Sequence, residues 1–318
     1  MISLFAKKIS VCSGVLYLIS GCDLHTSEPV NSFDDKISIN SLTPNTLNKN
    51  AYYFGFDLRA GPQEDARQYL PFLDYLEKAT GYQIKLKFTP TNSSIIDELG
   101  QGNIHFAAIG ADTYLKAHEA YGVTSLVRGK NQLSEASYRS MIVVSPDSSI
   151  KSIKDIKNKR FAFGNINSTQ GHLIPRIILT KNNIALNNLA AYEYTGSHRN
   201  CANAVITQKY DACGLQDTMA LALSKKGQVK ILHKSRYYPS SGIAANVNVD
   251  KDILNKMLNA LLKFDPLNKH KSNLYNWHKT EMPKGFEIAK PSDYAELREW
   301  SIKLGMLSPS QNKVDTEK

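Results

Sequence analysis

From about residue 52, segments in which apolar residues are spaced as in a strand alternate with segments in which they are spaced as in a helix. Residues 52–56 form a short apolar and aromatic run that is typical of a buried strand. Apolar residues then recur at helical spacing until Gly81, which stands where a helix C-cap is expected. Strands at about 84–88 and 104–109 enclose a further helix at about 92–100. This β-α-β-α-β order predicts a largely parallel sheet flanked by helices.

A second alternation of strands and helices begins at the apolar run 139–144, with helices starting at about 168 and 198. Two α/β lobes are therefore expected. The predicted parts are a first lobe at 51–140, a second lobe at 141–237, and a return to the first lobe with C-terminal helices at 238–318. Tyr138, Arg139 and Ser140 stand where the chain crosses between the lobes and are expected to act as a hinge.

The first 22 residues differ from the rest. Lys7 and Lys8 precede a short, mainly apolar stretch that is typical of an export signal and too short to span a membrane comfortably. Ile19-Ser20-Gly21-Cys22 resembles the bacterial lipobox, which implies that Cys22 is lipidated and becomes the mature N-terminus. An ordinary signal peptide and an uncleaved anchor are the alternatives. Asp23 resembles the signal that keeps a lipoprotein at the inner membrane.

Residues 23–50 are rich in Asn, Ser, Thr and Asp and show no sustained period, which predicts a flexible tether. The remainder suits a globular protein, since 318 residues with 42% hydrophobic content are enough for two domains. No later segment approaches the roughly 18 apolar residues that a membrane helix needs. The expected location is the periplasm, with the protein attached to a membrane through Cys22.

The formal net charge of +10 narrows the choice of partners. Lys and Arg are scattered and form no dense run interleaved with aromatic residues, so nucleic-acid binding is not expected. The positive surplus favours either solubility or the attraction of small anions.

Cys201 and Cys213 are the two cysteines that follow the N-terminal segment. In an oxidising compartment they can form at most one intramolecular disulfide, and two free buried thiols are the alternative. No histidine stands at ligand spacing from this pair, so neither a zinc site nor another metal site is expected.

A cluster of small polar residues, Asn167 to Gly171, stands between the strand-like RFAFG and the helical HLIPRIIL. Helix N-termini expose unpaired amides and the positive end of the helix dipole, so hydroxyl groups there can help to bind an anion. Ser168 and Thr169 supply hydroxyls, and Gly171 permits close approach of the chain. A plain N-cap that binds nothing is the alternative.

His198 stands at a second junction, where the strand AYEYTG leads into a helix. It is expected at the same end of the sheet as Ser168, where an imidazole can donate to an oxyanion. A surface or capping histidine is the alternative.

Three segments together carry a family resemblance. They are Asn-Ser-Thr-x-Gly-x-Leu-Ile-Pro at 167–175, Ser197-His198 with Ala204-Val205 and Tyr210-Asp211-Ala212 behind it, and LPFLDYLEKATGYQIKL at 70–86. With matching order and spacing over most of residues 51–265, the chain resembles the phosphate-, phosphite- and phosphonate-binding proteins of ABC importers.

The resemblance implies a two-lobed α/β clamp similar to type II periplasmic binding proteins. Each lobe would be a mostly parallel sheet flanked by helices, with the ligand in the interlobe cleft. Ser168, Thr169 and His198 match the positions that grip the phosphonate group. Such proteins are exported, are often lipid-anchored, and work as monomers with an ABC permease and ATPase. No cofactor is expected.

The ammonium end of the pocket in aminoalkylphosphonate binders is not matched. Of its two acidic positions, the first aligns with Thr218 and the second falls in 238–241. Pocket tyrosines are also missing, with Asn92 and Ile109 closest to their places. Because a buried ammonium without a carboxylate is costly, 2-aminoethylphosphonate is not expected to be the best ligand, unless the alignment slips by one residue to Asp217. Phosphate, phosphite, a short uncharged alkylphosphonate and other small anions stay open.

Further candidate residues stand at strand ends that are expected to face the cleft, with capping and core packing as alternatives. Arg59 also follows a strand, but it is expected to be a solvated surface residue. The remaining candidates are Asn92, Ser93, Tyr114, Gln170, Gln216, Asp217 and Ser241.

Two other classes of protein compete with a transport function as interpretations of the sequence. An enzyme is disfavoured, because the chain has no Gly-x-Ser-x-Gly elbow and no His-Glu-x-x-His motif. A receptor of the same fold that senses an anion or metabolite is the alternative, and it would need a partner protein to signal.

Overall fold

The computed structural model describes residues 51–59 and 61–308. The predicted signal segment, Cys22 and the tether at 23–50 lie outside the described residues. Within the described part of the chain, no helix combines the length and apolar character needed to cross a membrane.

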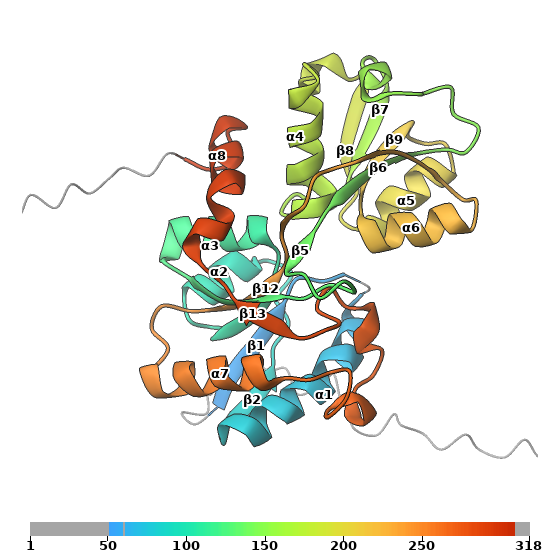
Figure 1. Ribbon diagram of the computed structural model, residues 1–318. Helices are drawn as coiled ribbons and strands as arrows, with labels where there is room; N and C mark the ends of the chain where they lie inside the picture. The colour runs from blue at the N-terminus through green and yellow to red at the C-terminus, as the bar shows by residue number, and fades with distance from the viewer. Residues whose placement is uncertain (1–50, 60, 309–318) are drawn as a thin grey trace, which may run out of the picture. The chain divides into compact units, whose positions relative to one another are not determined.

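A six-stranded sheet forms the first lobe (Figure 1). Its strand order is β13-β4-β12-β3-β1-β2. The strands are β1 (Ala51–Phe56), β2 (Gln83–Leu86), β3 (Phe106–Ile109), β4 (Thr124–Gly129), β12 (Gly242–Ala245) and β13 (Phe286–Ile288). Strands from the beginning and the end of the chain therefore share one sheet.

Helix α1 (Pro62–Thr80) shows how local sequence builds this lobe. Proline occupies the first helical position, where its missing N–H costs nothing, and Gly81 ends the helix in the left-handed region at φ 77°. Phe72 and Leu76 are fully buried, and the Phe72 ring lies 4.8 Å from that of Trp277. Truncation of such a residue to alanine typically costs about 3–5 kcal/mol. The other helices of this lobe are α2 (Ile95–Gly100), α3 (Ala111–Tyr121), α7 (Lys251–Lys263) and α8 (Ala295–Lys303).

A five-stranded sheet forms the second lobe, in the order β10-β6-β9-β7-β8. Its strands are β6 (Ser140–Val144), β7 (Arg160–Phe163), β8 (Ala191–Tyr194), β9 (Ala212–Gln216) and β10 (Lys230–Lys234). Its helical segments are a π-helical turn, η4 (Thr169–Leu173), which runs directly into α4 (Ile174–Lys181), then α5 (His198–Ile206) and α6 (Asp217–Lys225).

Both sheets are mixed, which corrects the expectation of mostly parallel sheets. The pairs of β1 with β2 and β3, and of β7 with β8 and β9, are parallel as expected. Strand β6 runs antiparallel to β9, and β12 runs antiparallel to β3. Both β6 and β12 directly follow a crossing between the lobes. A chain that arrives from the other lobe enters the sheet at the edge that faces the cleft. The parallel strands end at that edge, so the entering strand runs antiparallel to them.

Two crossing segments, β5 (Ser137–Tyr138) and β11 (Tyr238–Pro239), pair antiparallel, with Tyr138 opposite Tyr238. Figure 1 shows β5 between the two sheets. Helix α8 makes a further connection, since the Lys181 ammonium of α4 lies 5.2 Å from the Trp300 ring centroid. The two lobes are thus linked by a paired crossing and by a contact between the C-terminal helix and the second lobe.

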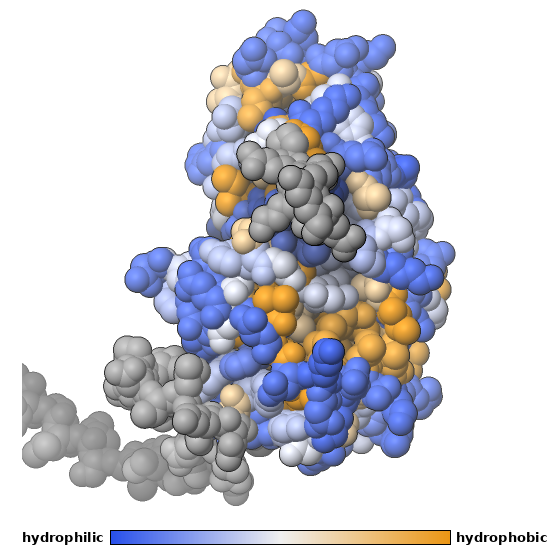
Figure 2. Space-filling view, turned by 90° about the vertical axis from the view of Figure 1, so that its left-hand side faces the viewer, coloured by the Kyte–Doolittle hydropathy of each residue, from blue (hydrophilic) through white to orange (hydrophobic). Residues whose placement is uncertain are grey.

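Most of the face seen in Figure 2 is hydrophilic, and its hydrophobic residues gather mainly on the lower half, which holds the six-stranded sheet. Large hydrophobic side chains that are exposed on segments of this lobe are Leu58, Leu70, Leu133, Val247, Leu262, Leu267 and Ile288.

Candidate ligand-binding site

The loop between β7 and the η4 turn is shaped by two glycines. The Gly164 amide donates to the Gly171 carbonyl oxygen at 2.8 Å. A Cβ atom on Gly171 would lie 3.0 Å from Cε1 of His198 and 3.1 Å from Cα of Gly164, so no larger residue fits without displacement. Ser168 caps the helical segment, because its Oγ accepts from the Gly171 amide at 2.9 Å. The chain therefore turns sharply and points the start of a helical segment at the cleft.

His198 begins α5, one residue after the N-cap Ser197. Its Nδ1 is buried and has no hydrogen-bond partner among the described residues. Burial lowers the pKa of His198 to about 4, Glu281 opposes this shift and Arg59 adds to it, so the imidazole is neutral near pH 7. A neutral ring carries one N–H, which can donate to an anion.

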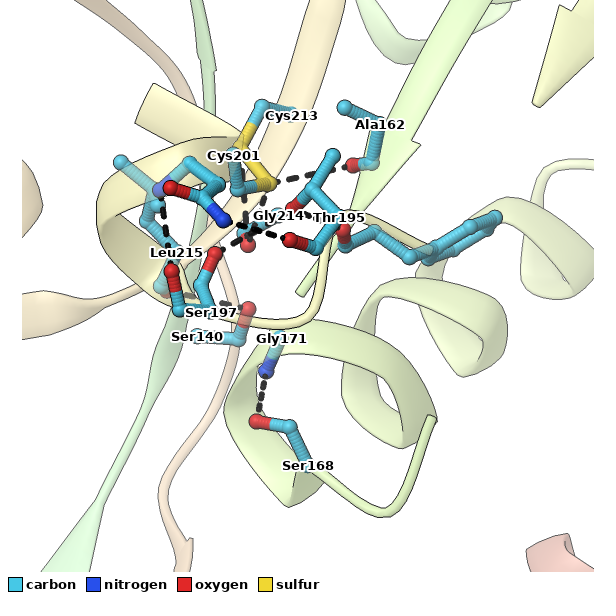
Figure 3. Close-up of a disulfide and its surroundings, with 12 residues drawn as sticks. Ser140, Ala162, Ser168, Gly171, Thr195, Ser197, Cys201, Cys213, Gly214 and Leu215 are labelled. Atoms are coloured by element: carbon cyan, nitrogen blue, oxygen red, sulfur yellow. Dashed lines mark hydrogen bonds between the residues drawn. A yellow bond between two sulfur atoms is a disulfide. The ribbon is translucent and has the colours of Figure 1, made fainter. Parts of the chain in front are cut away.

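A disulfide between Cys201 and Cys213 ties α5 to β9, with the two Cα atoms 5.9 Å apart. Figure 3 shows it above the turn that carries Ser197, with Gly171 and Ser168 on the adjoining helix start. Both cysteines are fully buried. The bridge thereby anchors the helix whose first residue is His198.

Thr169 and Asn167 contact the first lobe. The Thr169 Oγ1 accepts a 2.8 Å hydrogen bond from the backbone amide of Asp112, and its own O–H is left to donate. The Asn167 Oδ1 accepts from the Lys116 ammonium at 2.9 Å. The start of α3 and the loop at Asn167 therefore meet directly.

On the first lobe, Arg59 pairs with the carboxylate of Glu281 and donates to Ser241 Oγ at 3.2 Å. The Ser241 hydroxyl in turn donates to Glu281. The expectation of a solvated surface arginine at position 59 is wrong, because its side chain is 22% exposed and lines the cleft. Glu281 was missed by sequence reasoning, since it lies in an irregular segment before β13 and no motif marks it.

Asp57, which directly follows β1, lines the same first-lobe side of the cleft. Its Oδ2 accepts from the Gly110 amide at 2.9 Å and from the Thr113 hydroxyl at 3.1 Å. Burial raises the pKa of Asp57. These bonds hold the end of β1 against the start of α3.

The two lobes enclose a cavity of about 440 Å³, here called the anion cavity. This volume lies in the usual range for small-molecule sites. The buried Tyr138 hydroxyl at its wall has no hydrogen-bond partner among the described residues. Predicted site residues that line the cavity are Ser93, Asn167, Ser168, Thr169, Gln170, His198 and Ser241.

Five predicted site residues do not line the anion cavity. Asn92 is exposed outside it. Tyr114 is buried in the core, 4.6 Å from the ring of Tyr294, because the side of α3 that carries it packs inward. The Gln216 amide donates to the Thr218 hydroxyl at 3.1 Å, and Asp217 lines a neighbouring cavity. Gly171 packs against Gly164 within the loop.

The anion cavity holds one arginine, two carboxyl groups and one histidine, and the second carboxyl group, Asp57, accepts only from neutral donors. Arg59 is neutralised by Glu281, and His198 is uncharged near pH 7. The groups that can receive an anion are therefore hydroxyls, one imidazole N–H and backbone amides at helix starts. Among the described residues, no cluster of His, Cys, Asp and Glu side chains is suited to hold a metal ion.

Comparison with known proteins agrees with this arrangement. Residues 54–294 match the family described as ABC transporter, phosphonate, periplasmic substrate-binding protein. The chain is 24% identical over 234 residues to the phosphonates-binding periplasmic protein of Escherichia coli (strain K12), a match that covers 70% of this chain and 69% of that protein.

Two solved structures are similar in fold. PhnD1 of Prochlorococcus marinus (MIT 9301), in complex with methylphosphonate, has a TM-score of 0.72 at 17% identity, covering 82% of this chain and 100% of that chain. A binding protein component of an ABC phosphonate transporter from Pseudomonas aeruginosa has a TM-score of 0.69 at 22% identity, covering 80% and 86%. The two-lobed α/β fold similar to type II periplasmic binding proteins is thus confirmed. Because the family match spans most of the chain, this protein belongs to the periplasmic phosphonate-binding protein family of ABC transporters and is a substrate-binding protein, not an enzyme.

Proposed function

We propose that the protein closes on a small phosphorus oxyanion in the anion cavity and delivers it to an ABC permease and its ATPase. One observation carries this proposal. His198 Nδ1 and the Tyr138 hydroxyl are both buried at this cavity without a partner among the described residues, beside Ser168 and Thr169. A buried polar group left unpaired costs about 1–3 kcal/mol. A bound oxyanion would accept from such groups and recover that cost.

The neutral donors favour a tetrahedral oxyanion over a large polyanion. Ser168, Thr169 and His198 approach from two helix starts on the second lobe, while Tyr138 approaches from the crossing strand β5. Donors from several directions suit an acceptor with oxygens pointing several ways. Phosphate, phosphite and an uncharged alkylphosphonate all meet this requirement.

2-Aminoethylphosphonate is proposed to bind less well than an uncharged phosphonate. Thr218 stands at one aligned acidic position, and Ser240 and Ser241 stand in the segment of the other. Of the two carboxyl groups that line the cavity, Glu281 is already paired with Arg59 and Ser241, and Asp57 accepts from the Gly110 amide and the Thr113 hydroxyl. An ammonium placed there would have to compete with an arginine for its counter-ion.

Attachment to a membrane through Cys22 is part of the same proposal. It rests on the lipobox-like sequence Ile19 to Cys22 and agrees with a family whose members are periplasmic. Mass spectrometry of the protein from membranes tests it, because a lipidated N-terminal cysteine adds acyl mass and removes residues 1–21.

Thermal shift of the purified protein tests the ligand class. Phosphate, phosphite, methylphosphonate, 2-aminoethylphosphonate and sulfate are compared, and a ligand that binds the folded state raises the midpoint. Ser168→Ala and His198→Ala should abolish the response to a phosphorus oxyanion. Ser152→Ala is the control, since Ser152 also stands at the N-cap position of a helical segment in the second lobe but lies outside the cavity. No response to any of the phosphorus compounds, or an undiminished response in both cavity variants, contradicts the proposal.

A further inference from the structure

A second cavity of about 500 Å³ adjoins the anion cavity, and it is here called the side cavity. Tyr138, Gln170 and Glu281 line both cavities, so these three side chains form the partition between them. Tyr138 and Gln170 are 5% and 3% exposed, and the Tyr138 hydroxyl has no partner among the described residues. A molecule bound at Ser168 and Thr169 that extends past the partition enters the side cavity.

The side cavity is lined mainly by apolar surface from both lobes. Leu133 precedes β5, Met141 lies on β6, and Leu221 lies on α6. Leu133 is 67% exposed, Leu221 48% and Tyr237 40%, so three large hydrophobic side chains converge on one hollow and remain in contact with water. Scattered exposed hydrophobic residues are ordinary, but their convergence in a concave site is typical of a ligand surface.

Of the five Asp, Glu, Lys and Arg residues that line the side cavity, Lys234 and Lys279 are exposed to solvent and the other three are already engaged. Asp217 accepts from the Thr218 amide at 2.8 Å and from the Arg139 amide at 3.4 Å. The guanidinium of Arg139 lies 3.7 Å from the Tyr237 ring centroid. Glu281 is paired with Arg59. What the cavity offers to a guest is therefore mainly its apolar surface.

We propose that the side cavity holds the organic substituent of a phosphonate whose head group is bound in the anion cavity, and that this substituent is uncharged and apolar. The ligand class is thus an alkyl- or arylphosphonate larger than methylphosphonate. This inference rests on the proposed function, because the continuity with the anion site identifies the occupant. Lobe closure brings Leu133 and Leu221, which belong to different lobes, to the same substituent.

Isothermal titration calorimetry with methylphosphonate, butylphosphonate and phenylphosphonate tests this class. Each buried methylene contributes about fourfold in affinity. Butylphosphonate should therefore bind at least about tenfold more tightly than methylphosphonate, with a more negative heat-capacity change. Equal or weaker binding of butylphosphonate overturns the inference and leaves the proposed function standing. Failure of all three phosphonates to bind overturns the inference, and failure of phosphate and phosphite as well overturns the proposed function.

The Leu221→Asn variant tests whether the gain in affinity for butylphosphonate arises in the side cavity. It should remove most of the butyl advantage and leave methylphosphonate affinity within about twofold. Leu262→Asn is the matched control, because Leu262 is also an exposed leucine on a helix, 39% exposed on α7, and does not line either cavity. An equal loss in both variants, or an undiminished advantage in Leu221→Asn, overturns the inference. Tighter binding of 4-aminobutylphosphonate than of butylphosphonate overturns the proposal that the substituent is uncharged and apolar.

Discussion

The backbone amide of Asp112 on α3 donates a 2.8 Å hydrogen bond to the hydroxyl oxygen of Thr169 at the start of η4. Asp112 is 0% and Thr169 3% exposed, so water cannot replace either partner. The loop that is proposed to bind the anion is therefore also the loop through which the two lobes touch. We therefore expect occupation of the cleft to be coupled to the contact between the lobes through Thr169.

Thr169→Val should weaken both folding and binding. Valine keeps the shape of threonine but leaves the buried Asp112 amide without its acceptor, which costs about 1–3 kcal/mol. The donor proposed for the oxyanion is also lost, so methylphosphonate affinity should fall at least about tenfold. Urea denaturation and calorimetry measure the two effects. Thr169→Ser retains the hydroxyl and should stay close to wild type, and identical behaviour of the two variants contradicts this role.

Glu281→Gln should tighten the binding of an oxyanion. The change removes the negative charge that is paired with Arg59 and makes the cavity more positive, while the amide oxygen can still accept from Arg59. An effective gain of about 1–2 kcal/mol in this partly buried site corresponds to roughly 5–30-fold in affinity, and it should shrink with added salt.

Glu287→Gln serves as the control for that change. Glu287 pairs with Arg128 at 2.8 Å on the same lobe and does not line the anion cavity. Its substitution should leave affinity unchanged in calorimetric titrations. Weaker binding in Glu281→Gln would mean that the carboxylate contacts the ligand favourably.

His172 should make the fold sensitive to acid. Its Nδ1 lies 2.7 Å from the Ile166 carbonyl oxygen and must donate there, while Nε2 accepts from the Tyr194 hydroxyl at 3.1 Å. Burial lowers the pKa of His172 to about 4, so the native state stays unprotonated while the unfolded state binds a proton below about 6.5. Stability is therefore lost as the pH falls from about 6.5 to about 4, by up to about 3 kcal/mol.

The measurement is the free energy of unfolding as a function of pH for wild type and His172→Gln. The difference between them isolates His172 from Asp112, where burial raises the pKa to about 6 and the sign is opposite. The variant should show a flatter acid limb. His278→Gln replaces an exposed histidine and should keep the wild-type slope. Parallel curves for wild type and His172→Gln refute the assignment.

Loss of the disulfide should destabilise the protein. Cys201 and Cys213 are 12 residues apart, and closing a loop of this size is worth about 3 kcal/mol through the entropy of the unfolded chain. A Cys201→Ala, Cys213→Ala double variant should therefore unfold at lower denaturant concentration than wild type. Dithiothreitol should lower the wild-type midpoint in the same direction and leave the variant unchanged. An equal response of both proteins to the reductant would locate its effect elsewhere.

The second-lobe part of the site could be predicted because its determinants are local. A strand, a cluster of small polar residues and a helical run lie within about twenty positions, and Ser168 caps the helical segment that the pattern predicts. The close approach of Gly164 and Gly171 is likewise a short-range contact. His198 follows a second junction of the same kind, so the periodicity alone places both residues at the same end of one sheet.

The first-lobe part could not be predicted with the same success. Tyr114 and Asn92 stand at strand ends in the sequence, yet one packs in the core and the other is exposed. Glu281 and Arg59 meet across 222 positions of sequence, and no local pattern records such a pair. Which of several strand-end residues reaches the cavity depends on how the C-terminal segment folds back over the sheet.

The sequence by itself determined the order of strands and helices, the two lobes and the polar turns at 167–171 and 197–198, because propensity, capping and hydrophobic period act over a few residues. The tertiary structure alone decided the directions of β6 and β12, the pairing of Arg59 with Glu281 and the existence of the side cavity. These features arise where distant segments pack together. Their energies come from burial and charge pairing between segments, which one stretch of chain does not contain.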